Sequence, residues 1–134
     1  MTSIITIEGI GKKYAETLQA AGVRSVEKLL ETGATPKGRQ ELAEKTGISD
    51  KLLLEWINHA DLFRIKGVGE EYSDLLEAAG VDTVVELAQR NGENLFQKLV
   101  ATNEEKKLVR KLPTQGQVVD WIEQAKALPR VMTY

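Results

Sequence analysis

One pattern occurs twice in this sequence, and it restricts the fold more than any other feature. Residues Ile7–Val23 and Ile65–Val81 both begin Ile-x-Gly-apolar-Gly, and both end Ala-Ala-Gly-Val. The two copies align without a gap, at a constant spacing of 58 residues from Ile7 to Ile65. Agreement over so many positions indicates an internal duplication.

Each copy predicts a tight turn followed by a helix. Two glycines around one apolar residue permit the unusual backbone angles of a sharp turn, and the apolar residue, Ile10 or Val68, can fill a core below it. Tyr14, Leu18 and Ala21 of the first copy recur at helical spacing. The amide groups after the second glycine then lie at a helix N-terminus. There the helix offers them no partner, and an anion can bind.

This turn and helix resemble those of the helix-hairpin-helix family, in which a Gly-apolar-Gly hairpin joins two helices. The wider chain also resembles the bacterial family catalogued as domain of unknown function 4332. The first resemblance implies an all-helical fold and, for many members, contact with a DNA phosphate that is independent of base sequence. It also implies a monovalent cation on hairpin carbonyls when DNA is bound. By residue match these carbonyls belong to Ile5, Ile7 and Ile10, and we expect no cation there without DNA.

Cap signals and apolar periodicity predict helices along the rest of the chain. Ser25 and Thr35 both suit N-cap positions, and Pro36 suits the first helical position after Thr35. We expect a short extended or irregular entry over residues 2–6. We expect helices over residues 12–21, 26–31, 37–46, 51–62, 70–79, 83–90, 93–103, 104–112 and 115–128.

The two tryptophans form a second repeat. The run Leu53–Ala60 is similar to Val118–Ala125, and it matches Trp56 to Trp121 at a spacing of 65 residues. Since this spacing exceeds 58 by seven, the second copy carries an insertion of seven residues, which we place within Glu93–Pro113. Both tryptophans lie in apolar stripes, so we expect them to be buried at equivalent positions rather than available for base stacking.

Together these patterns predict an all-α fold of two pseudo-repeated helix-hairpin-helix units with packing helices, of the SAM-like type. We assign residues 1–62 to the first unit and residues 63–134 to the second, and expect them to form one compact unit. Ile10 has only residues 2–6 before it. We therefore expect the last helix to fold back, within one chain, as the leading helix of the first hairpin.

Composition excludes several classes of function. The 134 residues contain no cysteine, which excludes disulfides, thiolate metal sites and cysteine nucleophiles. The net charge is −2 and the isoelectric point is near 5.5, whereas dedicated nucleic-acid binders are usually basic. There is no apolar run of about 18 residues and no signal-peptide pattern, so we expect a cytoplasmic protein without a membrane segment.

The first hairpin is the better candidate for a DNA-phosphate site. It comprises Gly9, Ile10, Gly11, Lys12 and Lys13, which combine main-chain donors with two positive charges. The alternative is a turn that merely joins elements and carries exposed lysines.

The second hairpin has Glu70 and Glu71 where the first has lysines. Carboxylates stabilise a helix N-terminus but repel an anion there, so a structural or protein-facing role is our expectation. A secondary basic patch is formed by Lys106, Lys107, Arg110 and Lys111, which would share one face if the helix over 104–112 forms. An ordinary charged surface is the alternative.

No catalytic constellation is present. His59 is the sole histidine and no nucleophile motif accompanies it, so we expect a surface or packing residue rather than a base. We therefore expect a non-enzymatic module without cofactor or metal, which binds double-stranded DNA weakly through the first hairpin. The alternative is a protein-interaction or scaffold module that has kept the fold and lost the DNA site.

Overall fold

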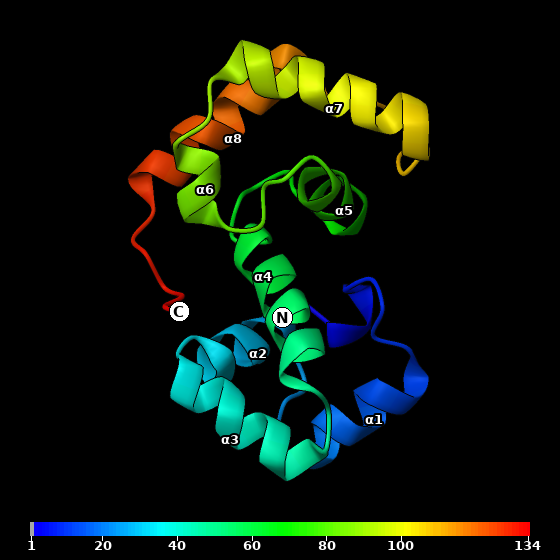
Figure 1. The fold of residues 1–134 in the computed structure, drawn as a ribbon, viewed down its shortest axis with the longest axis vertical. Helices are drawn as coiled ribbons and strands as arrows, with labels where there is room; N and C mark the ends of the chain where they lie inside the picture. Colours follow the sequence, from blue (N-terminus) through cyan, green and yellow to red (C-terminus); the bar gives the residue numbers. More distant parts are fainter. Residues whose placement is uncertain (1) are drawn as a thin grey trace. The chain divides into compact units, whose positions relative to one another are not determined.

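A computed structural model describes residues 2–134, and their regular elements are all helical (Figure 1). They are the 3-10 helix η1 (Ile4–Thr6) and the α-helices α1 (Lys12–Ala20), α2 (Val26–Gly33), α3 (Pro36–Thr46), α4 (Asp50–Leu62), α5 (Glu70–Ala78), α6 (Val84–Ala88), α7 (Gly92–Lys106) and α8 (Gln115–Ala127). Within these residues, β-pairing is limited to one isolated bridge between Ser3 and Ser25. The predicted all-α class is confirmed. None of the helices in this described part has both the length and the apolar character needed to cross a bilayer.

The chain divides into two compact units. Unit 1 contains residues 2–61 together with Val131–Tyr134, and unit 2 contains Leu62–Arg130. The division falls within one residue of the boundary that the sequence repeat suggests. The final segment differs from expectation, because we assigned Val131–Tyr134 to the second unit and it belongs to unit 1.

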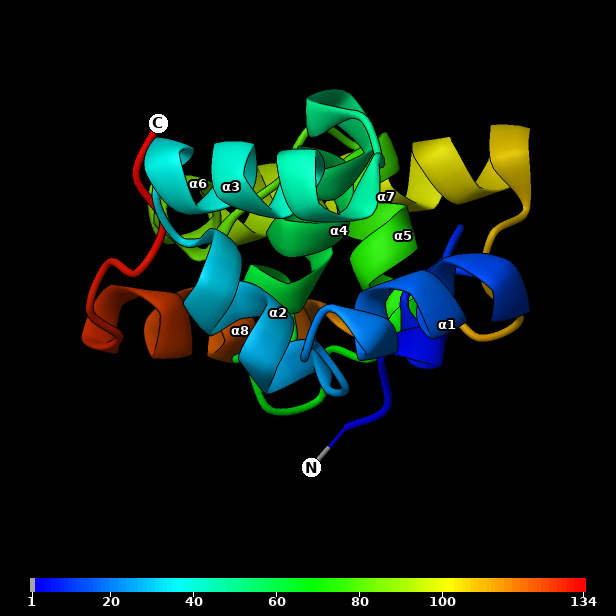
Figure 2. The ribbon, with the colours of Figure 1, turned by 90° about the horizontal axis from the view of Figure 1, so that it is seen from below.

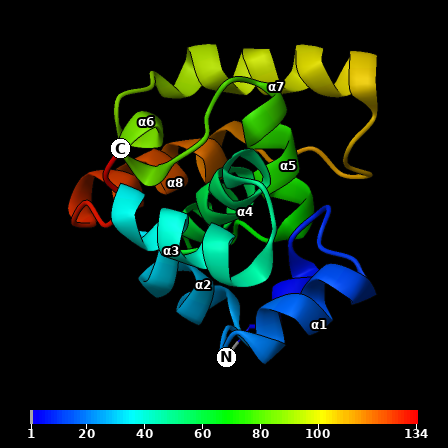
Figure 3. The same ribbon diagram turned by 60° about the horizontal axis from the view of Figure 1, so that its bottom comes forward.

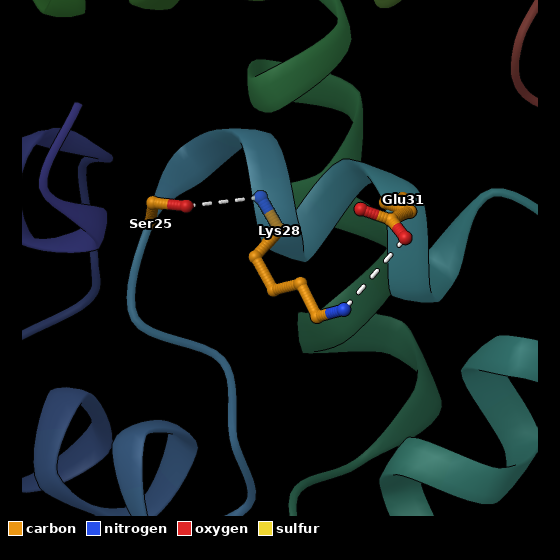
Figure 4. A network of polar contacts seen from close by, with 3 residues as sticks. All are labelled: Ser25, Lys28 and Glu31. Carbon is orange, nitrogen blue, oxygen red and sulfur yellow. Dashed lines mark hydrogen bonds and ion pairs between the residues drawn. The ribbon is translucent and has the colours of Figure 1, made fainter. Parts of the chain in front are cut away.

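Local cap signals place the helix starts where the sequence predicts them. The Ser25 hydroxyl accepts the Lys28 N–H at 3.1 Å, and Lys28 also pairs with Glu31 at 3.7 Å on the exposed side of α2 (Figure 4). The Thr35 hydroxyl accepts the Gly38 N–H at 3.0 Å at the start of α3. Each bond satisfies a donor that the first helical turn leaves without a partner, so the helix begins at a defined residue.

Unit 1 is built around α4, with α1, α2 and α3 beside it (Figure 3). Leu18, Leu29 and Ile57 are fully buried in its core. Helices α2 and α4 approach closely at Gly33, where a methyl group would collide with the Ile57 side chain. The entry segment is tied to this core, because the Val26 N–H donates to the Thr2 carbonyl at 2.8 Å.

Unit 2 packs α6 and α7 against α8, and α5 against α7. Its core is one cluster of buried apolar side chains, which includes Leu76, Leu87, Leu99 and Trp121. The helices share this core although α8 lies far along the chain from α5. We conclude that unit 2 closes on itself through its last helix.

The predicted break near residue 103 is wrong. Helix α7 continues to Lys106 and ends because Lys107 adopts a left-handed conformation with φ +51°. The Asn103 side chain then holds the next loop, accepting the Val109 N–H at 3.0 Å and donating to its carbonyl at 3.2 Å. Val109 is buried in the core of unit 2. These side-chain bonds satisfy the backbone of Val109 outside a helix, and the helix expected over 104–112 does not form beyond Lys106.

Two further expectations are corrected. The entry over residues 2–6 is not wholly irregular, since Ile4–Thr6 form η1 and Ser3 caps it. The last helix was expected to lead the first hairpin, but α8 packs in unit 2 on the second hairpin through Trp121.

Candidate nucleic-acid interface

The first hairpin turn is built by two successive main-chain hydrogen bonds. The Ile7 N–H donates to the Ile4 carbonyl at 3.1 Å, and the Ile10 N–H donates to the Ile7 carbonyl at 3.2 Å. Gly9 has a φ of +93°, which is strained for any residue with a Cβ, so the turn depends on this glycine. Ile4, Ile7 and Ile10 are all buried, whereas Glu8 in the turn is exposed. The apolar residues therefore anchor the turn and leave its tip in solvent.

The second hairpin has the same hydrogen bonds 58 positions later. The Ile65 N–H donates to the Leu62 carbonyl and the Val68 N–H to the Ile65 carbonyl, both at 3.1 Å. Gly67 has a φ of +97°, and Leu62, Ile65 and Val68 are buried. Leu62 is the last residue of α4, whereas its counterpart in the first hairpin belongs to η1. A single 3-10 turn thus provides the bonds that the end of a long helix provides in the second hairpin.

A tryptophan supports each turn from below. A Cβ added to Gly9 would lie 3.1 Å from the Trp56 Nε1, and a Cβ added to Gly67 would lie 3.1 Å from the Trp121 Nε1. Both tryptophans are only 2% exposed, as predicted for equivalent buried positions. Their indoles fill the space beneath the hairpins, so neither is available for stacking on a base.

A tyrosine from the helix after each turn completes the same arrangement. The ring centroids of Tyr14 and Trp56 are 5.0 Å apart, and those of Tyr72 and Trp121 are 5.2 Å apart. Aromatic pairs at this separation attract one another beyond simple burial. Each hairpin is thereby fixed to the helix that follows it and to the tryptophan helix of its own unit.

The first turn of α1 presents main-chain donors and positive charge together. Gly11 is the N-cap residue and has no side chain to accept a hydrogen bond from the helix. Lys12 and Lys13 are exposed, and the first turn contains no acidic residue. The opening amide groups of a helix lack partners within it, and the helix dipole adds partial positive charge there. This end of α1 is suited to an anion.

The corresponding turn of α5 has the opposite charge. Gly69 is again an N-cap without a side-chain bond, but Glu70 and Glu71 are exposed in the first turn. These carboxylates stabilise the helix end and repel an incoming phosphate. The two hairpins therefore share a backbone geometry and differ in electrostatics.

A family model described as "Domain of unknown function (DUF4332)" matches residues 8–128 of this chain. The chain belongs to this family. The match includes both hairpins and the helices that carry Trp56 and Trp121. No curated protein and no solved structure matches the DUF4332 chain.

The predicted basic patch of this DUF4332 chain is not a helix face. Lys106 ends α7, while Lys107, Arg110 and Lys111 lie in the loop that follows. All four side chains are exposed. The helical spacing that was to align them is lost, because the chain leaves the helix at Lys107. Their loop is held instead by Asn103 and by the Tyr72 hydroxyl, which donates to the Lys111 carbonyl at 3.0 Å.

One of the three carbonyls expected to hold a cation, those of Ile5, Ile7 and Ile10, takes part in the hairpin turn. The Ile7 carbonyl already accepts the Ile10 N–H, which leaves one lone pair on that oxygen for a cation. Among residues 2–134, no group of three or more histidine or acidic side chains is arranged to hold a metal ion.

Sequence reasoning missed Gln124, which holds the second hairpin by its backbone. Its side chain accepts the Lys66 N–H at 2.8 Å and donates to the Lys66 carbonyl at 3.1 Å. The available signal was its position three residues after Trp121. This spacing places Gln124 next to Trp121 on the same face of the helix. The matching position of α4 is His59, which is buried with 4% exposure.

Proposed function

We propose that this DUF4332 protein is a tandem helix-hairpin-helix module that contacts double-stranded DNA weakly through its first hairpin. Gly9, Ile10 and Gly11 would place the main-chain donors, and Lys12 and Lys13 would add the charge. The contact is with backbone phosphate, so it does not depend on base sequence.

The observation that carries this proposal is the first turn of α1. Its N-cap has no side-chain hydrogen bond, its two lysines are exposed, and no acidic residue lies among its first residues. A phosphate at this position would receive hydrogen bonds from the amides and would pair with the lysines. The tight Gly9 turn supports the same geometry, because it brings the backbone close to the surface without a side chain in the way.

The binding should be weak for two reasons. Only the first hairpin has lysines in the first turn of the following helix, since the second has Glu70 and Glu71 there, and the chain as a whole has a net charge of −2. Sequence-independent binding to DNA typically has a dissociation constant of about 10⁻⁴ to 10⁻⁶ M. We place this protein at the weak end of that range.

The alternative function is a protein-interaction or scaffold module that has lost contact with DNA. Glu70 and Glu71 favour it, because they occupy the anion position of the second hairpin. Gln124 also favours this alternative for the second hairpin, because its side chain bonds the Lys66 backbone and so gives that turn a structural role. Under this alternative the lysines of the first hairpin are simply solvated charges.

Fluorescence anisotropy with a labelled random-sequence duplex at low salt tests the proposal. We expect weak binding that is the same for unrelated sequences. If one or two phosphates are contacted, the logarithm of the affinity should fall with the logarithm of salt at a slope of about −1 to −2. Absence of binding at low salt would exclude the DNA proposal and leave the protein-interaction module.

A further inference from the structure

The segment Val131–Tyr134 binds unit 1 through its main chain, although it lies far from the rest of that unit in sequence. The Thr133 N–H donates to the Ala34 carbonyl at 2.8 Å. The Thr133 carbonyl accepts the Arg39 Nη2 at 2.7 Å. Figure 2 shows the segment, in red, beside the start of α3. Both main-chain polar groups of Thr133 are thus satisfied by unit 1, which is how an extended peptide is held by a receptor.

The side chains on either side of Thr133 are recognised as well. Met132 is buried, with 2% of its surface exposed. The Tyr134 ring lies under the Arg39 guanidinium, whose Cζ is 5.6 Å from the ring centroid, and its hydroxyl donates to the Asn58 Oδ1 at 3.2 Å. Alternate residues of the segment are therefore used for apolar burial and for a cation–π contact.

Arg39 is held ready for this segment by its own unit. Its Nη1 donates to the Gly33 carbonyl at 2.8 Å, and the side chain is buried, with 7% of its surface exposed. A buried guanidinium is costly unless its donors are satisfied. The bond to the Gly33 carbonyl fixes the orientation of the guanidinium. Its other amino nitrogen, Nη2, then donates to the Thr133 carbonyl. Arg39 therefore binds the main chain of the segment at Thr133 and does not require a particular side chain there.

The surface of unit 1 that holds Val131–Tyr134, formed around Ala34, Arg39 and Asn58, is here called the groove, and it extends beyond the residues that occupy it. A cavity of about 430 Å³ adjoins Tyr134, and it is lined by Pro36, Arg39, Gln40, Asp50, Leu54 and Tyr134 itself. Tyr134 covers only part of this space, since 62% of its surface remains exposed. A longer or bulkier segment could fill the cavity as well as make the contacts already seen.

We propose that this groove is a binding site for an extended peptide of a partner protein, with an apolar residue followed two positions later by an aromatic residue. Val131–Tyr134 has this pattern and occupies the site within the same chain as an internal competitor. A tethered segment acts at an effective concentration in the millimolar range, so four residues suffice in the same chain, whereas a separate partner needs more contacts. The site lies on α2, α3 and α4, and it does not depend on contact between the first hairpin and DNA.

The test uses the full-length protein and a fluorescent peptide of residues 126–134, followed by anisotropy. Replacing Met132→Asp should release the internal segment, because burying a carboxylate at a position that is only 2% exposed is costly. The apparent affinity for the peptide should then rise about tenfold over wild type. Thr133→Pro is the second variant, since it removes the N–H that the Ala34 carbonyl accepts and also restricts the backbone at Met132, while the Thr133 side chain that it replaces is exposed. Circular dichroism confirms that each variant remains folded.

Three results decide the matter. A peptide with aspartate in place of its methionine should bind neither variant. Excess peptide should also remove the exchange protection of the Thr133 amide in the wild-type protein, because it displaces the internal segment. The proposal is overturned if the folded variants bind the peptide no more tightly than wild type does. Equal binding of the aspartate peptide, or unchanged protection of the Thr133 amide, also overturns it.

Discussion

Trp121 and Gly67 are in direct contact: a Cβ on Gly67 would lie 3.1 Å from the indole Nε1. Trp56 has the same relation to Gly9 at the same distance. In each unit the last long helix therefore brings its tryptophan under the hairpin that begins that unit. The hairpin backbone and the tryptophan form one packed element, and the surface of the turn remains free for contacts outside the fold.

Gly67→Ala should destabilise the protein by about 1–2 kcal/mol, because alanine is strained at positive φ. The close Trp121 indole leaves the new methyl group little space to relax. Gly116→Ala is the matched control in the same unit. Gly116 lies in α8, and a Cβ added there would make only an ordinary van der Waals contact. There alanine should be neutral or stabilising, because it favours helix. Urea unfolding measures both, and equal effects would show that the turn does not require glycine.

The sequence was sufficient for features that depend on neighbouring residues. Ser25 and Thr35 cap the predicted helices, and Gly9 and Gly67 take the positive φ expected of the turn. Such signals act over three or four positions, so a reader of the sequence can evaluate them fully. The burial of both tryptophans was also predictable, since it follows from apolar periodicity.

Features that depend on distant contacts were missed. The sequence similarity around Trp56 and Trp121 could not show which hairpin each of the two helices supports. Pairing Trp121 with the first hairpin would close a loop about twice as long as pairing it with Gly67, at a cost of only about 0.6 kcal/mol. What favours the second hairpin is the fit of side chains such as Gln124 on the Lys66 backbone. That fit is a property of the folded unit and leaves no local pattern.

The end of α7 and the docking of Val131–Tyr134 were missed for the same reason. Charged residues 104–107 are good helix formers, yet Lys107 leaves the helix because Asn103 and the core hold Val109 elsewhere. Arg39 reads as a surface charge, but its spacing of three from buried Leu42 places it on the inner face of α3. Its burial depends on the Gly33 carbonyl and on the segment Val131–Tyr134, which lies far from it in the sequence.

Lys107→Gly should stabilise the protein by about 0.5–1 kcal/mol, because glycine adopts the left-handed conformation at this helix end without strain. Lys106→Gly is the matched control, one residue earlier and still helical. It should destabilise by a similar amount, since glycine is a poor helix former. Thermal unfolding of the two variants should shift Tm in opposite directions. A shift of the same sign in both would indicate that α7 does not end at Lys106.

Glu27 should make folding stability sensitive to acid. Its carboxylate accepts the Thr2 N–H at 2.9 Å, and this bond lowers its pKa below the ordinary value of 4.5. A carboxyl group whose pKa is lowered in the folded state stabilises that state at pH values above its pKa in the unfolded chain. That contribution disappears as pH falls through the folded pKa. Wild type should therefore exceed Glu27→Gln in Tm at neutral pH and lose this advantage well below 4.5.

Glu31→Gln is the control for this comparison. Glu31 lies on the same helix and is exposed, and it contacts Lys28 rather than Thr2. Its replacement removes one negative charge without touching the entry segment. If Glu27→Gln and Glu31→Gln change Tm equally at every pH, the Thr2 bond makes no particular contribution.

Exchanging the charges of the hairpins should change DNA binding and helix stability in opposite directions. Lys12→Glu with Lys13→Glu should abolish binding, yet stabilise α1, because carboxylates favour a helix N-terminus by about 0.3–1 kcal/mol each. Glu70→Lys with Glu71→Lys should strengthen binding by adding phosphate contacts, while weakening α5. Loss of binding in a variant that is more stable than wild type cannot result from unfolding.

The matched control changes two exposed lysines of the same unit away from the hairpin, Lys37→Glu and Lys51→Glu. It alters net charge by the same amount as the change at Lys12 and Lys13. Anisotropy at low salt should then show most of the wild-type affinity in the control, because local charge at the turn, and not net charge, holds the phosphate. If the control loses as much affinity as the hairpin variant, binding comes from overall charge, and the first hairpin is not the site.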